Sequence, residues 1–204
     1  LRAILRASAY GNIRIMLPLI TGVSEVRSVR TILQNVMREL DSKEIPYDKD
    51  ILLGVMIETP AACMLADILA KEADFFSIGT NDLTQYTIAV DRGNENVAYL
   101  YSAFHPAVLR SVKRIIECAK RENIEVGMCG EAAGNPAMIP LLLAFGLDEF
   151  SVTASKVLET RKNIASWTMK EAAAVTDTVM GMSTEKEVSA YLSDYIATKM
   201  SNGK

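Results

Sequence analysis

Residues 52–70 read LLGVMIETPAACMLADILA, and this stretch contains a complete strand-to-helix unit. The apolar run 52–57 predicts a buried strand. Thr59 can cap a helix and Pro60 suits a first helical position, so a helix over 61–70 should follow at once. A strand that feeds directly into a helix is the repeating unit of a parallel sheet covered by helices.

The same alternation recurs on both sides of this stretch. Further short apolar runs at 13–17, 75–78, 126–128 and 149–152 are expected strands. Between the first two strands, apolar residues recur at steps of three and four and predict one face of a helix. That face consists of Val26, Val29, Ile32, Leu33, Val36, Met37 and Leu40.

Helix boundaries have their own sequence signals. We expect Ser24 to cap the first long helix and Pro46 to mark the exit from it. Another helix should begin at Pro106. Beyond Val152 the pattern predicts three helices without strands between them, near 155–164, 170–179 and 184–199. Thr184 and Glu187 form a capping-box pair at the start of the last helix.

About five strands that each feed a helix predict an α/β fold, and specifically the C-terminal portion of a (β/α)8 TIM-type barrel that ends in several helices. Residues 1–204 would form a single domain, incomplete at its N-terminus, because the chain starts at Leu1 inside an apparent helix tail. An incomplete barrel would leave unpaired strand edges, so we expect instability, a partner or further upstream residues. A flavodoxin-like or Rossmann sheet is the alternative, although no Gly-x-Gly-x-x-Gly turn follows any strand.

Composition narrows the class of protein. Half of the 204 residues are hydrophobic, which allows a sizeable core, and the net charge of -3 is spread over mixed-sign segments. The sequence has no basic stripe of the kind that binds nucleic acid, so nucleic acid is not an expected partner. Its longest apolar runs are far shorter than the ~20 residues needed to cross a bilayer. With no targeting segment and an odd number of cysteines, Cys63, Cys118 and Cys129, we expect a cytoplasmic protein with reduced thiols.

In a barrel the active site lies at the carboxyl ends of the strands, so polar residues that follow the apolar runs are the candidates. They are Glu58, Asn81, Asp82, Arg92 and Cys129. Neighbouring strands would bring Glu58 and Asp82 together, and two such carboxylates suit Mg²⁺. The alternative, equally open from spacing alone, is that Glu58 holds a loop while Asp82 caps a helix from Leu83.

The other candidates also have two interpretations each. The polar turn at 79–82 could present backbone N–H groups to an anion. Arg92 could bind a phosphate with two hydrogen bonds, or lie on the surface. A cysteine thiol is mainly protonated at neutral pH, so Cys129 could donate a proton, or be a buried structural thiol. His105, which is the one histidine, is expected at the entry to a helix.

Three segments together resemble the phosphoenolpyruvate-utilising enzymes: residues 75–87 with Asp91 and Arg92, residues 54–62, and residues 127–131. The continuation at 89–95 and 105–109 is similar to the enzyme I branch, the phosphoenolpyruvate-protein phosphotransferases of the bacterial sugar phosphotransferase system. The resemblance covers essentially the whole chain. Phosphoenolpyruvate synthase, pyruvate phosphate dikinase and a non-catalytic dimerisation module are the alternatives.

The resemblance implies a site and its partners. Glu58 and Asp82 would hold Mg²⁺, Asn81 and Arg92 would contact the phosphate, and Cys129 would face the methylene carbon of phosphoenolpyruvate. The phosphoryl group would pass to a histidine in an N-terminal domain, which is absent from this sequence, and then to the carrier protein HPr, leaving pyruvate. A homodimer is expected. Phosphate-binding arginines from the first part of the barrel are also missing, so the chain alone should not phosphorylate itself.

Overall fold

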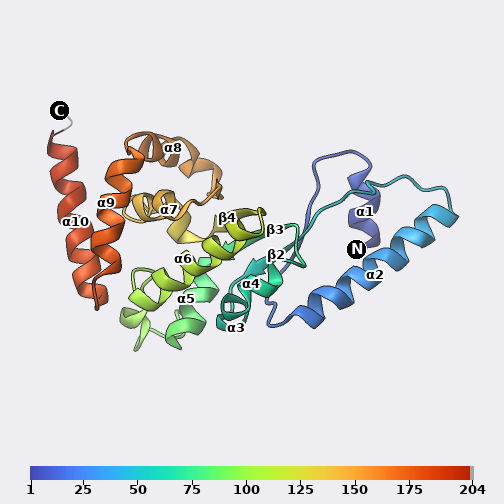
Figure 1. The fold of residues 1–204 in the computed structure, drawn as a ribbon, viewed down its shortest axis with the longest axis horizontal. Coiled ribbons are helices and arrows are strands. Elements are labelled where there is room, and N and C mark those ends of the chain that lie inside the picture. Colours follow the sequence, from blue (N-terminus) through green and yellow to red (C-terminus); the bar gives the residue numbers. More distant parts are fainter. Residues whose placement is uncertain (203–204) are drawn as a thin grey trace.

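Five short parallel strands form the centre of the protein, in a computed structural model that describes residues 1–202 (Figure 1). The strands are β1 (Ile15–Leu17), β2 (Leu53–Ile57), β3 (Phe75–Gly79), β4 (Glu125–Cys129) and β5 (Glu149–Phe150). The helices are α1 (Arg2–Ser8), α2 (Val23–Ser42), α3 (Pro60–Met64), α4 (Ala66–Leu69), α5 (Thr80–Ile88), α6 (Pro106–Arg121), α7 (Ile139–Phe145), α8 (Val157–Ala165), α9 (Met169–Met180) and α10 (Glu185–Asn202).

The strands lie in the sheet in their order along the chain, β1-β2-β3-β4-β5, and each pairs in parallel with the next. A doubly wound sheet reverses its strand order at a switch point, whereas a (β/α) barrel adds each strand beside the previous one. The predicted α/β fold with a parallel sheet is therefore confirmed. The strand order is that of consecutive units of a barrel.

One face of the sheet is covered by helices and is buried. Side chains alternate along each strand, so every second residue points toward the helices. Those residues have less than a tenth of their surface exposed and are Ile15, Leu17, Leu53, Val55, Ile57, Phe76, Ile78, Val126 and Met128. On the other face Met16 is 40% exposed, and Arg14 lies over the Phe75 ring, 5.4 Å from its centroid.

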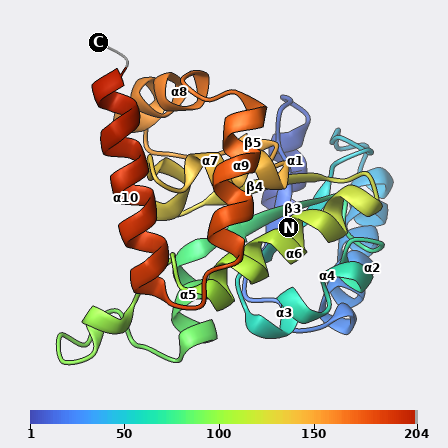
Figure 2. The ribbon, with the colours of Figure 1, turned by 60° about the vertical axis from the view of Figure 1, so that its left-hand side comes forward.

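The elements spread along one long axis. Helix α2 extends at one end of the molecule, and α9 and α10 lie side by side at the other end, so the first and last helices, α1 and α10, are far apart (Figures 1 and 2). Lys199 of α10 donates to Glu171 of α9 (3.1 Å) and lies 4.2 Å from the centroid of the Trp167 ring. These contacts fasten the last helix to the body.

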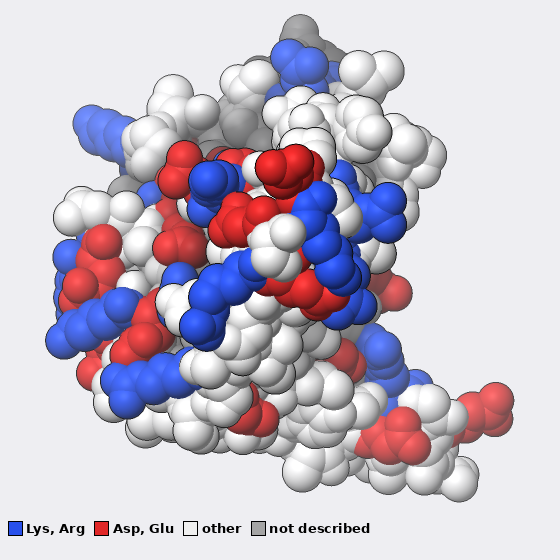
Figure 3. Space-filling view, turned by 90° about the vertical axis from the view of Figure 1, so that its right-hand side faces the viewer, with Lys and Arg blue, Asp and Glu red and all other residues white. Residues whose placement is uncertain are grey.

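On the face at the α2 end, blue and red side chains alternate without a large patch of one sign (Figure 3). Ion pairs between α2 and later segments account for part of this pattern, such as Arg27 with Glu72 (2.6 Å). Exposed pairs of this kind contribute little, about 0 to 1 kcal/mol each.

Among the described residues, no helix combines the length and the apolar character needed to cross a membrane.

Several helix boundaries match the sequence signals and others do not. Thr59 caps α3 by accepting from the Ala62 amide (3.0 Å), and the Thr184–Glu187 capping box is present. Ser24 is not a cap: the N-cap residue of α2 is Gly22, two residues earlier, because the Glu25 carboxylate accepts from the Thr21 and Gly22 amides.

Two helices differ from expectation in extent. The helix predicted over 61–70 is broken at Leu65 into α3 and α4, whose backbone there has φ -96° and ψ 11°. Helix α7, an apolar segment too short for a clear period, was not predicted. The three predicted C-terminal helices are α8, α9 and α10.

At the amino ends of the strands, two aspartates pin the strand register in the same way. Asp74, just before β3, accepts from the Leu53 amide (2.7 Å), and Asp148, just before β5, accepts from the Val126 amide (2.9 Å). Each aspartate also donates its own amide to the carbonyl of the same partner residue (3.0 Å). Because the register is fixed at the amino ends of the strands, the residues at the carboxyl ends remain available for chemistry.

We predict that Asp148→Ala destabilises the chain by about 1–3 kcal/mol, because the amide of fully buried Val126 loses its side-chain acceptor. Urea unfolding measures the change. Asp177→Ala, at an exposed position on α9, should stay within about 0.5 kcal/mol of the original protein. Equal effects of the two substitutions would contradict the proposed pinning.

Candidate active site at the carboxyl ends of the strands

The polar residues predicted from the strand ends lie close together at one edge of the sheet. Glu58 directly follows β2, and Asn81 and Asp82 follow β3 after Thr80. Helix α5 begins at Thr80 with Gly79 as its N-cap residue, so Asn81 and Asp82 belong to the first helical turn. Asp82 is therefore not the cap of a helix from Leu83, and the segment 79–82 is not a separate turn.

The Glu58 side chain is buried, with only 4% of the residue exposed, and its carboxylate is held in a fixed position. Its Oε1 accepts from the Leu19 amide (2.7 Å), and Leu19 takes the left-handed backbone conformation with φ 51°. On the other side, a Cβ on Gly79 would lie 2.6 Å from Glu58 Oε2 and 2.8 Å from its Cβ. Glycine at position 79 thus makes the room that Glu58 occupies.

Two effects oppose ionisation of Glu58. Burial raises its pKa most, and the neighbouring Asp82 carboxylate raises it further, while the hydrogen bond from Leu19 acts in the opposite direction. Among the described residues no cation pairs with Glu58, and a buried acid beside a second acid stores unfavourable electrostatic energy. Such groups gather at functional sites.

Arg92 approaches this pair from the connection after α5. Its Nη2 lies 3.7 Å from Asp82 Oδ1, and its backbone amide donates to the Gln85 side chain (3.2 Å). The guanidinium remains about half exposed, so it is free to contact an anion at the rim. The Tyr101 hydroxyl donates to the Asn81 carbonyl (3.1 Å) and ties the same connection back to α5.

Cys129 ends β4 and is the register partner of Gly79 on β3. Within the described part of the chain its thiol makes one hydrogen bond, a long one donated to the Ile78 carbonyl (3.7 Å). The Thr80 hydroxyl donates to the Cys129 carbonyl (2.9 Å), which places the β4 end against the start of α5. Cys63 and Cys118 are buried within helices instead, where burial raises the pKa of both thiols.

His105 has the place that the sequence predicts. It is the N-cap of α6, where Nδ1 accepts from the Ala107 amide (3.2 Å).

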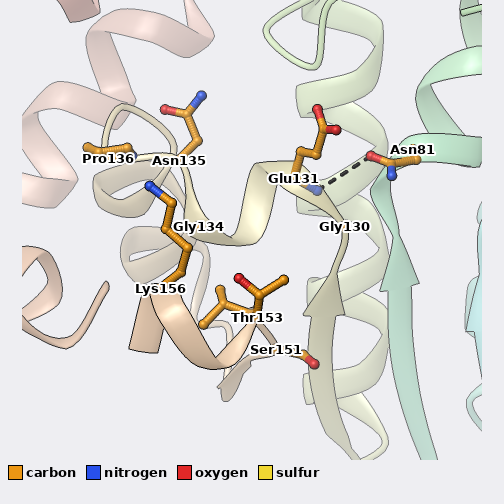
Figure 4. Close-up of a pocket in the computed structure, with 10 residues that line it drawn as sticks. Asn81, Gly130, Glu131, Gly134, Asn135, Pro136, Ser151, Thr153 and Lys156 are labelled. Atoms are coloured by element: carbon orange, nitrogen blue, oxygen red, sulfur yellow. Dashed lines mark hydrogen bonds between the residues drawn. The ribbon is translucent and has the colours of Figure 1, made fainter. Parts of the chain in front are cut away.

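Beside Cys129 a cavity of about 550 Å³ opens between the loops that follow β4 and β5 (Figure 4). Polar side chains on its wall are Asn81, Glu131, Asn135, Ser151, Thr153 and Lys156. Asn81 Oδ1 accepts from the Glu131 amide (3.4 Å), drawn as the dashed line in Figure 4. Glu58, Asp82 and Arg92 do not line this cavity, so the site and the cavity meet only at Asn81.

Three contributors were missed by the sequence analysis. Thr153 follows the predicted last strand, 149–152, and met the same criterion as the other candidates. Ser151 lay inside that predicted strand and lines the cavity because β5 ends at Phe150. Leu19 contributes a backbone amide, which leaves no mark on the residue type.

The carboxylates of the candidate site suit a hard divalent cation that keeps much of its hydration shell. Among residues 1–202, no three His, Cys, Asp or Glu side chains gather as a ligand group. Glu58 and Asp82 would supply two carboxylates, and Mg²⁺ typically takes one or two from the protein with water and substrate oxygens completing an octahedron. The raised pKa of Glu58 reflects an unfavourable energy of ionisation, which such a cation would offset.

Gly79→Ala should destabilise the chain by about 1–3 kcal/mol, because its Cβ would overlap the Glu58 carboxylate and force that side chain out. Gly181→Ala is the matched control, since its Cβ would meet no atom closer than 3.5 Å. Urea unfolding compares the two. If Gly79→Ala is as well tolerated as Gly181→Ala, Glu58 is not confined as described.

Glu58→Gln should stabilise the chain against heat at neutral pH when no divalent cation is present. Because the folded-state pKa of Glu58 lies above its usual value of 4.5, its ionisation costs stability as pH rises through that pKa. Below about pH 4 the side chain at position 58 is uncharged in both the original protein and the variant, so their melting temperatures should coincide. Melting curves from pH 4 to 8 in a chelator test this, and a difference that does not grow with pH would contradict it.

Comparisons with known proteins give a consistent result. The family described as "PEP-utilising enzyme, PEP-binding domain" matches residues 1–169. The phosphoenolpyruvate-protein phosphotransferase of Geobacillus stearothermophilus is 48% identical over 192 residues, which cover 94% of this chain and 33% of the relative. The proteins of the same name from Listeria monocytogenes and Bacillus subtilis (strain 168) are 48% and 46% identical, over 97% and 95% of this chain and 34% of each relative.

The chain thus spans about a third of the length of these curated relatives. Among solved structures, a citrate lyase from Burkholderia xenovorans LB400 superposes with a TM-score of 0.60 at 17% identity, covering 97% of this chain and 67% of that chain. At this identity the likeness concerns the fold alone.

Proposed function

Because the chain belongs to the PEP-utilising enzymes and carries their PEP-binding domain, we propose that it is the phosphoenolpyruvate-binding part of a phosphoenolpyruvate-protein phosphotransferase. Residues 1–204 would be one domain that forms the C-terminal part of a barrel within a longer enzyme. The complete enzyme would transfer the phosphoryl group of phosphoenolpyruvate to its own histidine and then to HPr. It would work as a homodimer in the cytoplasm.

One arrangement supports this proposal most strongly. Glu58 and Asp82 are adjacent carboxylates at the ends of neighbouring strands, Arg92 lies 3.7 Å from Asp82, and Cys129 ends the next strand. A divalent cation, an anion-binding guanidinium and a thiol are the groups needed to take a phosphoryl group from an enol and to protonate the carbon left behind.

The two carboxylates would hold Mg²⁺. When bound, the ion supplies a Lewis acid for the negative charge that develops on the enolate oxygen as the phosphoryl group departs. Because Glu58 Oε1 already accepts from the Leu19 amide, Oε2 is the oxygen that would be available to the ion. The site is thus shaped before the ligand arrives, which lowers the cost of binding.

Arg92 and Asn81 would bind the phosphoryl group. The guanidinium now lies 3.7 Å from Asp82, at the edge of ion-pair distance, so it can turn to a phosphate with two parallel hydrogen bonds. Asn81 keeps its Nδ2 available because Oδ1 accepts from Glu131. The free N–H groups of the first turn of α5 add positive potential at the same place.

Cys129 would protonate the enolate of pyruvate at its methylene carbon, and its thiolate would remove that proton in the reverse direction. Among the described residues, a long hydrogen bond to the Ile78 carbonyl is the one that the thiol makes. It can therefore turn toward a substrate without breaking a strong hydrogen bond.

Phosphoenolpyruvate synthase and pyruvate phosphate dikinase would use the same barrel chemistry with a different partner domain. The names and identities of the relatives favour the phosphotransferase. A non-catalytic dimerisation module would need neither the strained carboxylate pair nor the exposed guanidinium.

Calorimetric titration tests the proposal. Phosphoenolpyruvate should bind a protein extended at the amino end to the length of the relatives, in Mg²⁺ but not in chelator, and Asp82→Asn should abolish this binding. The 204-residue chain should bind more weakly because the arginines of the missing strands are absent. Mg²⁺-independent binding, or binding unchanged by Asp82→Asn, would refute the assignment of the metal site.

Cys129→Ala in the extended protein should leave the dissociation constant of phosphoenolpyruvate nearly unchanged and lower turnover by at least about 100-fold, the usual contribution of a positioned acid. Pyruvate formation in the presence of HPr measures turnover. An unchanged rate would remove Cys129 from the role of proton donor while leaving the binding assignment intact.

A further inference from the structure

We propose that Thr80 is a positioning residue, whose hydroxyl fixes the peptide that follows Cys129 and thereby aims the Cys129 thiol at the substrate carbon. The proposal rests on the proposed function for its consequence in turnover. Its structural content, that Thr80 controls Cys129, does not depend on that function.

The contact between the two residues is short and enclosed. Thr80 is 2% exposed, and its Oγ1 donates to the Cys129 carbonyl at 2.9 Å. This carbonyl ends β4, beyond the last register pair of β4 with β5 at Met128 and Phe150. Among the described residues, the Thr80 hydroxyl is the one donor to this carbonyl.

The geometry of the next residue shows how tightly this peptide is held. Gly130 has φ 92°, a conformation that side chains rarely adopt, and a Cβ there would lie 2.4 Å from Thr80 Oγ1. The hydroxyl occupies the space that the missing side chain leaves. One turn therefore fits against the other, with glycine on one side and the threonine hydroxyl on the other.

A second bond joins the same two turns, since Asn81 Oδ1 accepts from the Glu131 amide (3.4 Å). We call the Thr80–Cys129 and Asn81–Glu131 bonds together the turn clasp. The clasp links the first turn of α5, which carries Asp82, to the strand end that carries Cys129. Because the thiol itself has only a 3.7 Å contact, its direction depends on the backbone that the clasp fixes.

Helix α5 offers a matched control. Thr84 lies one turn after Thr80 and is fully buried, yet its hydroxyl has no hydrogen-bond partner within the described part of the chain. Thr→Val removes the same hydroxyl at both positions and keeps the shape of the side chain. Only the substitution at position 80 breaks the clasp.

The first measurement is the rate at which iodoacetamide alkylates Cys129 in the 204-residue chain, followed by mass spectrometry. Cys63 and Cys118 are 3% and 1% exposed and serve as internal references for global opening. Thr80→Val should raise the Cys129 rate about fivefold, the change in population that loss of one net hydrogen bond produces. Thr80→Ser, which keeps the donor, and Thr84→Val should stay near the original rate.

The second measurement is turnover in the extended protein. Thr80→Val should lower kcat by about 10- to 100-fold with little change in KM, as expected when a reacting group is displaced by about 1 Å. Thr80→Ser should restore kcat. If Thr80→Val does not fold, Thr80→Ala removes the hydroxyl without adding a methyl group and provides the same comparison.

An unchanged Cys129 alkylation rate in folded Thr80→Val, or an equal change in Thr84→Val, would overturn the proposal. If Thr80→Val speeds alkylation of Cys129 but the extended protein with the original Thr80 has no phosphotransferase activity, the clasp is supported and the proposed function is refuted. If the extended protein is active and Thr80→Val leaves its kcat unaltered, the proposed function is supported and the positioning role of Thr80 is refuted.

Discussion

The buried Glu58 carboxylate, placed beside Asp82, is the constraint on which the rest of the site depends. An ionisable group that is 4% exposed and next to a second acid costs stability unless something offsets it. The chain keeps the group in place by a Leu19 amide on one oxygen and by the absent side chain of Gly79 near the other. The chain thus carries an electrostatic strain that a divalent cation would relieve, and such strain is characteristic of a site kept for function.

The parallel sheet places the other candidate residues beside the Glu58–Asp82 pair. Because all five strands run in one direction, their carboxyl ends meet at one edge, and residues far apart in the sequence become neighbours. Asp74 and Asp148 fix the register at the opposite edge, where no candidate residue lies. Stability and chemistry are therefore separated along the strands. The Thr80 hydroxyl then connects the two chemical halves of the site, the carboxylates and the thiol.

Much of this arrangement was predictable from the sequence, because burial leaves a pattern of residue types. Glu58 and Cys129 each end an apolar run, and the alternation of strands and helices gave the parallel order. What depends on backbone atoms was not predictable: the Leu19 amide has no signature, and the start of α5 at Thr80 moved Asp82 from a cap position into the first turn. The break at Leu65 and short α7 were missed because propensity and periodicity are weak over so few residues.

The most direct test of the central claim is titration of Mn²⁺, as a paramagnetic substitute for Mg²⁺, into the 204-residue chain, followed by electron paramagnetic resonance. We predict one saturable site that disappears in both Glu58→Gln and Asp82→Asn and persists in Cys129→Ala. Mn²⁺ binding that survives removal of either carboxylate, or no saturable binding in the folded chain, would contradict a cation shared by Glu58 and Asp82.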